Sequence, residues 1–483
     1  MDNETKTVRR LVRFVTFTLI FILFTRTPAD ADLWWHLRAG QVMFEQKQIL
    51  LTDVFSFTRF GENWVNAFWV SELLLFGLYS LGRYFAITLF VSFTGAVTFY
   101  LLSHRLNGND FVNAFAIILA AVAAAPIWGP RPQIISFLFI ALLDDWLTRK
   151  RSAWLLPALF ALWANLHGGW IWGFLLILAH LAGNILTLAT QPEERKKLWN
   201  ETRNLALWSL IAALAVGLNP NGLGIWTLPF KQVSVSMQIQ EWLSPNFHRI
   251  DFHPFLWMLF LLLLISPFAP KPPAWGQIIK VLGFSYLTFV AQRNIAIAAI
   301  AAAPLLADWM NAALKTLQTD KRLSPRPNLP LPLRTFINTL LIFSLSAAAL
   351  GNAFAASTPD KVEKNYPTAA IAWMKTNRPQ GPMFNSYNLG GYLLWTLPEY
   401  PVFIDGRADL YGDELIHEWM EISNGTDSGL ALLEERGIQI ILLEPEHGLI
   451  PRLNPQEWRQ VYADDKIIIL ITLHFAIAGR QMR

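Results

Sequence analysis

The sequence predicts a polytopic α-helical membrane protein, with about eleven transmembrane helices and a small C-terminal α/β domain. Of the 483 residues, 53% are hydrophobic and 15% are charged, whereas a soluble domain has roughly 25% charged residues. The 21 Trp and 34 Phe suit the aromatic belts of a protein that lies in a bilayer. The apolar runs stop near residue 356, and the rest of the chain has the hydropathy of a globular domain. The lipid bilayer is therefore the first expected partner.

Composition and missing motifs exclude several other classes. Cysteine is absent, which excludes disulfides, Cys-based zinc sites and thiol nucleophiles. No run of Lys and Arg is interleaved with aromatic residues, so nucleic acid is not an expected partner. Neither a G-x-G-x-x-G loop nor a Walker loop is present, so a nucleotide is not indicated.

Eleven apolar runs are long enough to predict membrane spans, because a span needs about 20 largely apolar residues. A twelfth segment, 65–81, is nearly as apolar, so the parity of the spans depends on it. The eleven runs begin near Leu11, Phe85, Phe111, Ile134, Trp154, Ile171, Leu205, Phe255, Gly276, Ile295 and Thr335.

Basic residues decide between the two topologies, because Lys and Arg concentrate in cytoplasmic loops. If segment 65–81 lies on the outer surface without crossing, all basic loops fall on one side. This topology places the N-terminus in the cytoplasm and the C-terminal domain outside it. One alternative stays open: Arg9 and Arg10, the apolar stretch to Phe24 and residues 29–31 also resemble a cleavable signal peptide, which would remove the first span.

The predicted organisation is a membrane domain, 1–356, with a first outer loop at 28–84, followed by an α/β domain, 357–483. A basic, Pro-rich linker at 318–334 precedes the last span. In the C-terminal domain the alternating pattern predicts a small, mostly parallel sheet. Its expected strands are 382–385, 401–405, 438–443 and 466–471, and its expected helices are 367–375, a Gly-Gly-entered helix to 397, 414–422, 429–436 and 455–461.

Polar residues at the outer ends of the spans share one side of the membrane. Ionisable groups at membrane depth are costly, so a site is the first hypothesis where several converge. Carboxylates, imidazoles and guanidiniums on one side suit chemistry on an anionic, lipid-linked substrate. The catalytic candidates are Asp32, Asp30, Asp53 and Glu72, and the substrate-binding candidates are His36, Arg131, Gln133, Asn165, His167, Arg293, Asn385, Asp405, Arg407, Asp409 and Tyr411.

The segment Asp-Leu-Trp-Trp-His-Leu-Arg begins at Asp32, just after the first span. If it is helical, Asp32 and His36 are an i,i+4 pair on one face. Asp32 could take a proton from an acceptor hydroxyl, while His36 could orient it or bind a metal. Trp34 and Trp35 could anchor the helix at the membrane surface or stack on a sugar. The alternative is a surface helix whose Asp and His face water, and Glu72 could equally be a carboxylate favoured by a helix N-terminus.

Arg131 and Arg293 are the candidates for binding a lipid phosphate or diphosphate, because a planar guanidinium binds phosphate with two hydrogen bonds. Lys231 could share this role. Either arginine could instead extend to the lipid headgroups. His167 could be a metal ligand, a substrate donor or a hydrogen-bonded turn residue. A divalent metal ion is thus left open, with His36, Glu72 and His167 as its candidate ligands.

The segment Phe-Ile-Asp-Gly-Arg-Ala-Asp-Leu-Tyr, 403–411, follows an expected strand. Ligand crevices form at the carboxyl ends of strands in open α/β sheets, so this segment could bind substrate. It could equally be a salt-bridged turn that docks the domain. The pair Gly390-Gly391 is interpreted as a tight turn, and Asp144-Asp145, next to Arg149, as structural.

This layout resembles the GT-C glycosyltransferases, including the protein mannosyltransferase and aminoarabinose transferase relatives. In that fold the acidic motif after the first span supplies the base, and Asp32 is the matching position. Several segments are also similar to a bacterial group of GT-C-like membrane proteins: DLWWHLRAG, TDVFSFT, RPQ, ANLHGG, NPNG, EWLSP, QRN and FIDGRADLY. This second resemblance covers nearly the whole chain.

The resemblance implies a glycosyltransferase of the bacterial inner membrane. The sugar would come from a polyprenyl-phosphate carrier and go to a glycan, lipid or protein acceptor by an inverting displacement. Asp32 would be the base, and Arg131 and Arg293 would stabilise the departing phosphate. The alternatives are a non-catalytic transporter or scaffold for lipid-linked glycans, and a GT-C-fold glycan ligase or polymerase. A transporter should show paired repeats or broken helices at the membrane midplane, and no internal repeat is found.

Overall fold

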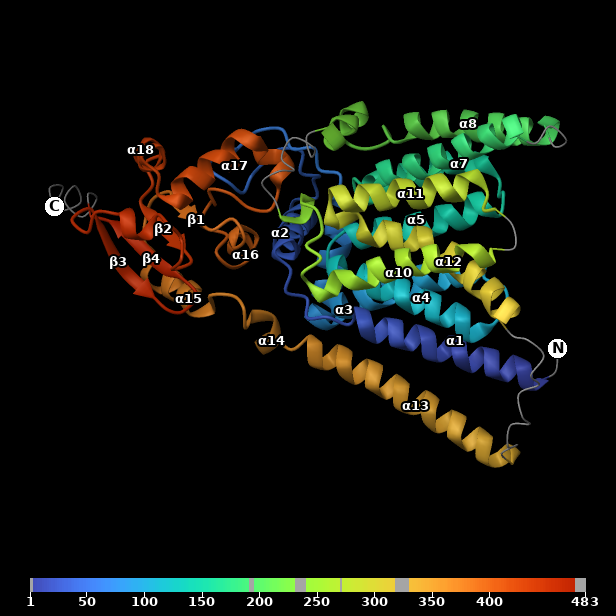
Figure 1. The fold of residues 1–483 in the computed structure, drawn as a ribbon. Helices are drawn as coiled ribbons and strands as arrows, with labels where there is room; N and C mark the ends of the chain where they lie inside the picture. Colours follow the sequence, from blue (N-terminus) through green and yellow to red (C-terminus); the bar gives the residue numbers. More distant parts are fainter. Residues whose placement is uncertain (1–2, 191–194, 231–239, 270–271, 318–329, 474–483) are drawn as a thin grey trace. The chain divides into compact units, whose positions relative to one another are not determined.

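A computed structural model describes residues 3–190, 195–230, 240–269, 272–317 and 330–473 (Figure 1). The chain folds as two compact units, and each is built from separate stretches of sequence. The first, called here the helical unit, comprises Met1–Thr27, Phe85–Leu218 and Ile239–Ser357. The second, called here the mixed unit, comprises Pro28–Tyr84, Asn219–Gln238 and Thr358–Arg483. The first outer loop, which the sequence analysis assigned to the membrane domain, is thus grouped with the C-terminal domain.

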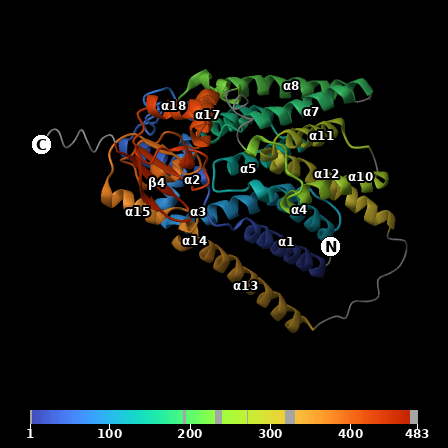
Figure 2. The same ribbon diagram turned by 60° about the vertical axis from the view of Figure 1, so that its left-hand side comes forward.

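The helical unit is a bundle in which α4, α10, α11 and α12 lie together in both views (Figures 1 and 2). Its elements are α1 (Asn3–Phe24), the part of α3 (Trp69–Ser103) from Phe85 on, α4 (Asp110–Ala124), η1 (Ala125–Ile127), α5 (Gln133–Thr148), η2 (Ala153–Leu155), α6 (Leu156–Leu166), α7 (Trp170–Thr190), α8 (Arg195–Ala215), η5 (Gln240–Trp242), η6 (Ile250–Phe252), α10 (His253–Ile265), η7 (Ser266–Phe268), α11 (Trp275–Val290), η8 (Gln292–Asn294), α12 (Ile295–Leu317) and α13 (Leu331–Ala356).

A helix forms at each of the eleven predicted apolar runs. Six helices among the described residues are both long enough and apolar enough to cross a membrane, so the count of eleven spans is not confirmed. The six candidate spans are Trp69–Ser103, Asp110–Ile127, Trp170–Thr190, Ile250–Phe268, Gln292–Leu317 and Leu331–Ala356.

Burial differs sharply between the candidate spans. In Gln292–Leu317 the most apolar window is 78% buried inside the protein, whereas in Leu331–Ala356 it is 11% buried. The first of these spans, Gln292–Leu317, has alanine at six of the eight positions from 296 to 303. Small side chains let neighbouring helices approach closely. The last span, α13, instead has many exposed large apolar side chains, which suit contact with lipid.

A kink divides α3 and coincides with the boundary between the units. Gly82 has φ −149° and ψ 19°, and Arg83 has φ 49° and ψ −138°, so neither residue has helical backbone geometry. The predicted surface helix at 65–81 and the predicted span from Phe85 are therefore separated by this kink. The helix itself begins at Trp69.

The mixed unit combines the first loop with the C-terminal sheet and its helices. Its elements are α2 (Ala31–Gln46), the first part of α3, η4 (Gly222–Thr227), α14 (Pro359–Glu363), α15 (Thr368–Asn377), β1 (Met383–Asn385), α16 (Gly390–Thr396), α17 (Ala408–Asn424), α18 (Asp427–Glu435), β2 (Ile440–Leu443), η9 (Ile450–Arg452), β3 (Trp458–Ala463) and β4 (Ile468–Thr472).

The sheet has the strand order β1-β2-β4-β3. Strands β1 and β2 are parallel, with Met383 opposite Ile440. Strand β4 is antiparallel both to β2 and to β3. The prediction of a mostly parallel sheet is therefore wrong. All residues of β1 and β2 are buried, so these two strands form the centre of the unit's core.

Two predicted elements differ in type from the structure. Segment 455–461, predicted as a helix, contains the start of β3. The Trp, Val and Tyr side chains of β3 favour a strand. The Asp464 side chain then closes the hairpin by accepting hydrogen bonds from the N–H groups of Lys466 and Ile467. Segment 401–405, predicted as a strand, joins no sheet and makes only an isolated parallel bridge, from Val402 to Ser56.

Candidate functional site

Asp32 lies in the first turn of α2, and the predicted helix at this segment is confirmed. Asp30 is the N-cap residue, and its carboxylate accepts a hydrogen bond from the Asp32 N–H at 2.9 Å, as expected for this residue type at a helix start. The Asp32 Oδ1 accepts a hydrogen bond from the Trp35 Nε1–H at 3.1 Å. Asp32 is half-buried, so its carboxylate is oriented by the protein but still reachable.

His36 lies beside Glu72, a residue of the first part of α3. Its Nδ1 is 3.2 Å from Glu72 Oε1, and Asn66 Nδ2 donates a hydrogen bond to Glu72 Oε2 at 2.8 Å. All three side chains are buried. The predicted alternative for His36, a residue facing water, is therefore wrong, and the carboxylate of Glu72 serves as its buried partner.

Trp34 and Trp35 are both inside the mixed unit and expose 0% and 5% of their surface. The Trp34 ring packs edge-on against Tyr366 and Tyr392, with ring centroids 5.2 and 5.1 Å away. The expectation that these two tryptophans anchor the helix at a membrane surface, or stack on a sugar, is wrong. They form the core that fixes α2.

Two glycines allow the backbone of the C-terminal domain to approach α2, and a third allows two segments of that domain to approach each other. A Cβ on Gly406 would lie 2.1 Å from Asp32 Oδ1, and a Cβ on Gly391 would lie 2.6 Å from the Ala31 carbonyl oxygen. A Cβ on Gly390 would lie 2.2 Å from the Ile404 carbonyl oxygen. The Gly390-Gly391 pair opens α16, which confirms the helix predicted to begin at these glycines, and the Gly390 N–H closes a turn by donating to the Tyr387 carbonyl oxygen.

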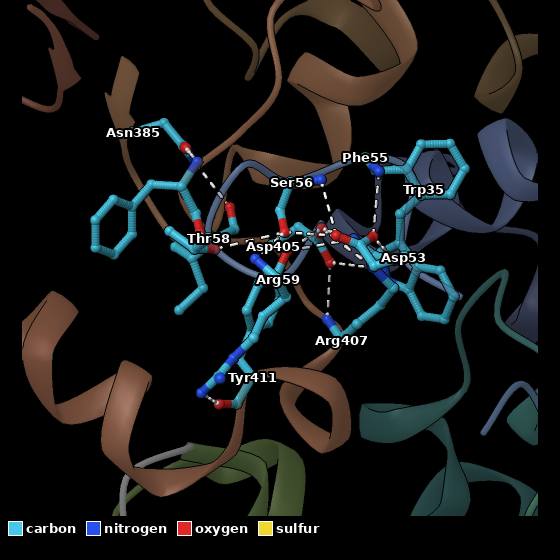
Figure 3. Close-up of polar contacts among 12 residues, drawn as sticks. Trp35, Asp53, Phe55, Ser56, Thr58, Arg59, Asn385, Asp405, Arg407 and Tyr411 are labelled. Carbon is cyan, nitrogen blue, oxygen red and sulfur yellow. Dashed lines mark hydrogen bonds and ion pairs between the residues drawn. The ribbon is translucent and has the colours of Figure 1, made fainter. Parts of the chain in front are cut away.

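Arg407 is the centre of a fully buried polar network (Figure 3). Its Nε and Nη2 donate to the two oxygens of Asp405 at 2.9 and 2.7 Å. Its Nη1 donates to Asp53 Oδ1 at 2.7 Å. The Tyr411 hydroxyl donates to Asp405 Oδ2 at 2.6 Å. Asp53, of the first loop, also accepts from Ser56 Oγ at 2.6 Å.

Two carboxylates and one guanidinium give this network a formal charge of −1. Burial by itself lowers the pKa of Arg407, but Asp405, Tyr411 and Asp53 outweigh it and hold that pKa well above its ordinary value. Burial, followed by the charge of Asp405, raises the pKa of Tyr411 well above its ordinary value. The guanidinium also lies 4.9 Å from the centre of the Trp64 ring. The network is a salt-bridged clamp between the first loop and segment 405–411. This geometry agrees with the alternative that the segment is a salt-bridged turn which docks the domain.

Asn385, at the end of β1, holds the segment that was predicted as a strand. Its Nδ2 donates to the Ile404 carbonyl oxygen at 2.8 Å, and its Oδ1 accepts from the Phe403 N–H at 2.8 Å. On the other side, Val402 exchanges backbone hydrogen bonds with Phe55 and Phe57. A side chain thus takes the place of a neighbouring strand, which explains why residues 402–404 are fully buried outside the sheet.

Asp409 is half-buried in the first turn of α17. The charges of Asp409 and of Arg407 both act on Glu72. The mixed unit therefore brings together Asp32, His36, Glu72, Asp53, Asp405, Arg407, Asp409 and Tyr411, through the direct contacts and charge interactions given above.

The helical unit contains a second polar group, around Arg131. The Arg131 Nη1 and Nη2 donate to the two oxygens of Glu241 at 3.1 and 2.7 Å. The Arg293 guanidinium lies 4.2 Å from the centre of the Trp242 ring. The backbone of segment 240–243 is held by Gln292, whose N–H donates to the Leu243 carbonyl at 2.9 Å and whose Nε2 donates to the Gln240 carbonyl at 2.7 Å.

His167 follows α6 and is buried beside these arginines. Its Nδ1 is 2.7 Å from Ser136 Oγ and accepts a hydrogen bond from the Gly169 N–H at 2.8 Å. An Nδ1 that accepts places the proton of the neutral ring on Nε2. Burial, together with the charges of Arg293 and Arg131, lowers the pKa of His167 to about 3. His167 is therefore a neutral residue at physiological pH.

Glu241 keeps its negative charge in this surrounding. Burial by itself raises the pKa of this carboxyl, but the charge and hydrogen bonds of Arg131, together with Arg293, outweigh it and lower the pKa below its ordinary value. Arg131, Arg293 and Glu241 therefore carry a net charge of +1.

The remaining candidates have more local roles. Gln133 is a buried first residue of α5. Asn165 Nδ2 donates to the Leu218 carbonyl at 2.9 Å and ties two loops of the helical unit together. Asp144, interpreted as structural, pairs with Lys280 at 2.8 Å. Lys231 lies outside the described residues.

Metal binding by His36, Glu72 or His167 stays a prediction. His36 and Glu72 belong to the mixed unit, and His167 belongs to the helical unit. Within the part of the chain that the structure describes, no group of three or more His, Asp or Glu side chains is arranged to hold a metal ion.

Sequence reasoning missed Gly406 and Glu241 as determinants of these groups. Gly406 had a signal, since a glycine between two charged residues, Asp405 and Arg407, indicates a backbone that something approaches closely. Glu241 lies in the segment EWLSP, but its pairing with Arg131 spans 110 positions and leaves no local pattern.

Comparison with known structures identifies the fold. The structure is similar to archaeal oligosaccharyltransferase AglB from Archaeoglobus fulgidus, which was solved in complex with an inhibitory peptide and a dolichol-phosphate. The TM-score is 0.62 and the sequence identity is 10%, and the match covers 92% of this chain and 70% of that one. It is also similar to the apo form of the Archaeoglobus fulgidus oligosaccharyltransferase, with a TM-score of 0.55 and 13% identity over 89% and 69% of the two chains. Neither protein-family models nor curated proteins give a match.

The chain therefore shares the fold of these two oligosaccharyltransferases, which agrees with the GT-C-like layout that the sequence resemblance implied. At 10% and 13% identity this likeness defines the fold alone.

Proposed function

We propose that this protein is a glycosyltransferase that moves a sugar from a polyprenyl-phosphate-linked donor to an acceptor hydroxyl. The reaction takes place on the extracytoplasmic face of a bacterial inner membrane, with the N-terminus in the cytoplasm. The observation that carries the proposal is the Asp32 carboxylate, which is oriented by Trp35 and backed by Gly406 in a chain with the GT-C fold.

Asp32 is the proposed general base. It is half-buried, and its Oδ1 has a fixed position because it accepts from the Trp35 indole N–H at 3.1 Å. A base must be held within hydrogen-bond reach of the proton that it abstracts. Among the other carboxylates, Asp53 and Asp405 are committed to Arg407, and Glu72 is committed to Asn66 and His36. Asp32 is therefore favoured over these three carboxylates.

The proposed donor site is the Arg131–Arg293 group of the helical unit. Its net charge of +1 suits an anionic phosphate, and guanidiniums form strong hydrogen bonds to phosphate oxygens. The dolichol-phosphate and the peptide bound in the archaeal neighbour are a lipid phosphate and a polypeptide, and these two ligand classes motivate the choice of substrates here.

The proposed reaction is a single displacement. The acceptor oxygen forms a bond to the sugar C1 while the bond from C1 to the phosphate oxygen breaks. The phosphate leaves with that electron pair, Asp32 takes the acceptor proton, and the configuration at C1 inverts. The acceptor is a hydroxyl of a glycan, a lipid or a protein.

The direct test is sugar transfer in proteoliposomes that contain the full chain, with labelled polyprenyl-phosphate sugars and extracted cell-envelope acceptors. Wild type is expected to transfer the label, and Asp32→Asn is expected to lose at least about 100-fold in rate, as is typical when a general base is removed. Glu45→Gln is the matched control, because Glu45 is an exposed carboxylate on the same helix.

The outcomes distinguish the proposed enzyme from its rivals. Transfer at the wild-type rate by Asp32→Asn would show that the base is another group. Movement of a lipid-linked glycan across the bilayer without any transfer would identify a transporter. Transfer from diphosphate-linked but not monophosphate-linked donors would identify a glycan ligase or polymerase.

A further inference from the structure

We propose that Glu241 makes the Arg131–Arg293 group select its lipid-linked donor by charge, so that the group prefers a phosphodiester-linked sugar over a diphosphate-linked one. This inference rests on the proposed function, because it takes that group to be the donor site. It assigns to Glu241 a role in donor specificity, and it makes no use of the proposed base.

Arg131 and Glu241 form an ion pair with two parallel hydrogen bonds. Both nitrogens at the end of the guanidinium donate to the two oxygens of one carboxylate. A phosphate binds a guanidinium in this same two-bond arrangement. Glu241 therefore occupies the face of Arg131 that a donor phosphate would use, and the two anions compete for it or share the site.

The backbone, and not only the side chain, holds Glu241 near the site. Gln292 accounts for two hydrogen bonds to the segment that carries it, and the next residue, Trp242, lies under Arg293. The side chains of Arg131 and Glu241 expose 13% and 38% of their surface. A ligand can thus reach the pair, but the carboxylate stays within the group when it is displaced.

The net charge of the group favours a donor with a single negative charge. His167 is neutral, for the reasons given above, so the group has two positive charges and one negative charge. A sugar linked through a phosphodiester carries one negative charge and balances the group. A sugar linked through a diphosphate carries two, and its second charge meets the Glu241 carboxylate. In a partly buried site, like charges are poorly screened and repel strongly.

The test is the binding of two defined lipids to the full chain in nanodiscs: polyprenyl-phosphate glucose and polyprenyl-diphosphate glucose, at one ionic strength. Glu241→Gln keeps the size of the side chain and raises the group's charge to +2. This variant is expected to shift the ratio of the two Kd values about tenfold or more toward the diphosphate lipid. The reason is that it removes the repulsion between the Glu241 carboxylate and the second charge of the diphosphate.

Two further variants separate charge from shape and from folding. Glu241→Asp keeps the charge and is expected to keep the wild-type ratio. Glu201→Gln is the matched control, because it removes a carboxylate from a solvent-exposed pair with Lys150 and is expected to leave both Kd values unchanged.

The outcomes separate this inference from the proposed function. An unchanged ratio in a Glu241→Gln protein that still binds both lipids would overturn the inference and leave the proposed donor site standing. Equal shifts in Glu241→Gln and Glu241→Asp would also overturn it, because shape would then decide. Wild type that binds neither lipid would count against the donor site itself.

Discussion

Gly406 lies directly against the carboxylate of Asp32. A Cβ on Gly406 would come within 2.1 Å of Asp32 Oδ1 and within 3.1 Å of Trp35 Nε1, the donor that orients this oxygen. The neighbours of Gly406 in sequence, Asp405 and Arg407, are both locked in the buried clamp with Asp53. The clamp therefore fixes the backbone against which the proposed base rests.

Gly406→Ala is expected to reduce the rate of sugar transfer about 100-fold, because a misplacement of about 1 Å can cost that much. The added methyl group must push the Asp32 carboxylate away from the Trp35 N–H. The measurement is kcat and the KM for the lipid donor in proteoliposomes. Gly77→Ala is the control, since a Cβ there meets no atom within 4 Å. A normal kcat in Gly406→Ala would mean that the position of Asp32 does not matter.

Arg407→Met is expected to destabilise the protein by about 3–5 kcal/mol, since it leaves the carboxylates of Asp53 and Asp405 buried without their cation. Thermal and denaturant unfolding in detergent measure the effect. Arg452→Met is the matched control, because Arg452 pairs with Asp427 on the exposed surface, where an ion pair contributes about 0–1 kcal/mol. Equal losses in the two variants would show that the clamp contributes no special stability.

Asn385→Leu is expected to cost about 3 kcal/mol, because it leaves the buried Phe403 N–H and Ile404 carbonyl without partners, at about 1–3 kcal/mol each. The same unfolding experiments apply. Asn377→Leu, at an exposed position on α15, should change the stability by much less. Hydrogen exchange gives a local check: the Phe403 amide should exchange faster in Asn385→Leu, and unchanged protection would contradict the role given to Asn385.

His167 is expected to make the protein less stable in acid. Its pKa in the folded protein is about 3, whereas the unfolded chain binds the proton near pH 6.5. The unfolded state therefore takes up the proton first, so the free energy of unfolding is at its full value above pH 6.5 and falls as the pH is lowered toward 3. Between pH 7 and pH 5 this one residue accounts for a loss of about 2 kcal/mol.

The variant His167→Asn isolates this contribution, because asparagine does not titrate. The difference between unfolding free energies at pH 7 and pH 5 should be smaller in His167→Asn than in wild type. His417→Asn, at an exposed position, should behave like wild type. An identical pH dependence in wild type and His167→Asn would mean that the pKa of His167 is the same in the folded and unfolded states.

The elements that sequence analysis predicted well are those with a strong local pattern. The apolar runs near Leu11 and Phe111 became helices, because long apolar stretches leave the backbone no better way to satisfy its hydrogen bonds in lipid. The helix that begins after Asp30 was also expected, and a capping side chain marks its start. In the C-terminal domain, β1, β2 and β4 lie within a few residues of their predicted positions.

The failures have long-range causes. Segment 401–405 has the composition of a strand, but the Asn385 side chain and the first loop supply its hydrogen bonds in place of a neighbouring strand. Segment 455–461 has a helix-like start at Pro455, but β4 pairs with it from residue 458 on. The contact of His36 with Glu72, 36 positions away, likewise had no local pattern that could predict it.

By itself, the sequence predicted a membrane protein with a small C-terminal domain of helices and strands, and it singled out nearly all of the polar residues that form the two groups. These properties depend on composition and on local periodicity, which can be read directly from the amino-acid sequence. Only the tertiary structure decided the partners: Arg407 with Asp53 across 354 positions, Arg131 with Glu241 across 110, and His36 with Glu72 across 36. Contacts between distant residues depend on how whole elements pack, and no local pattern carries that information.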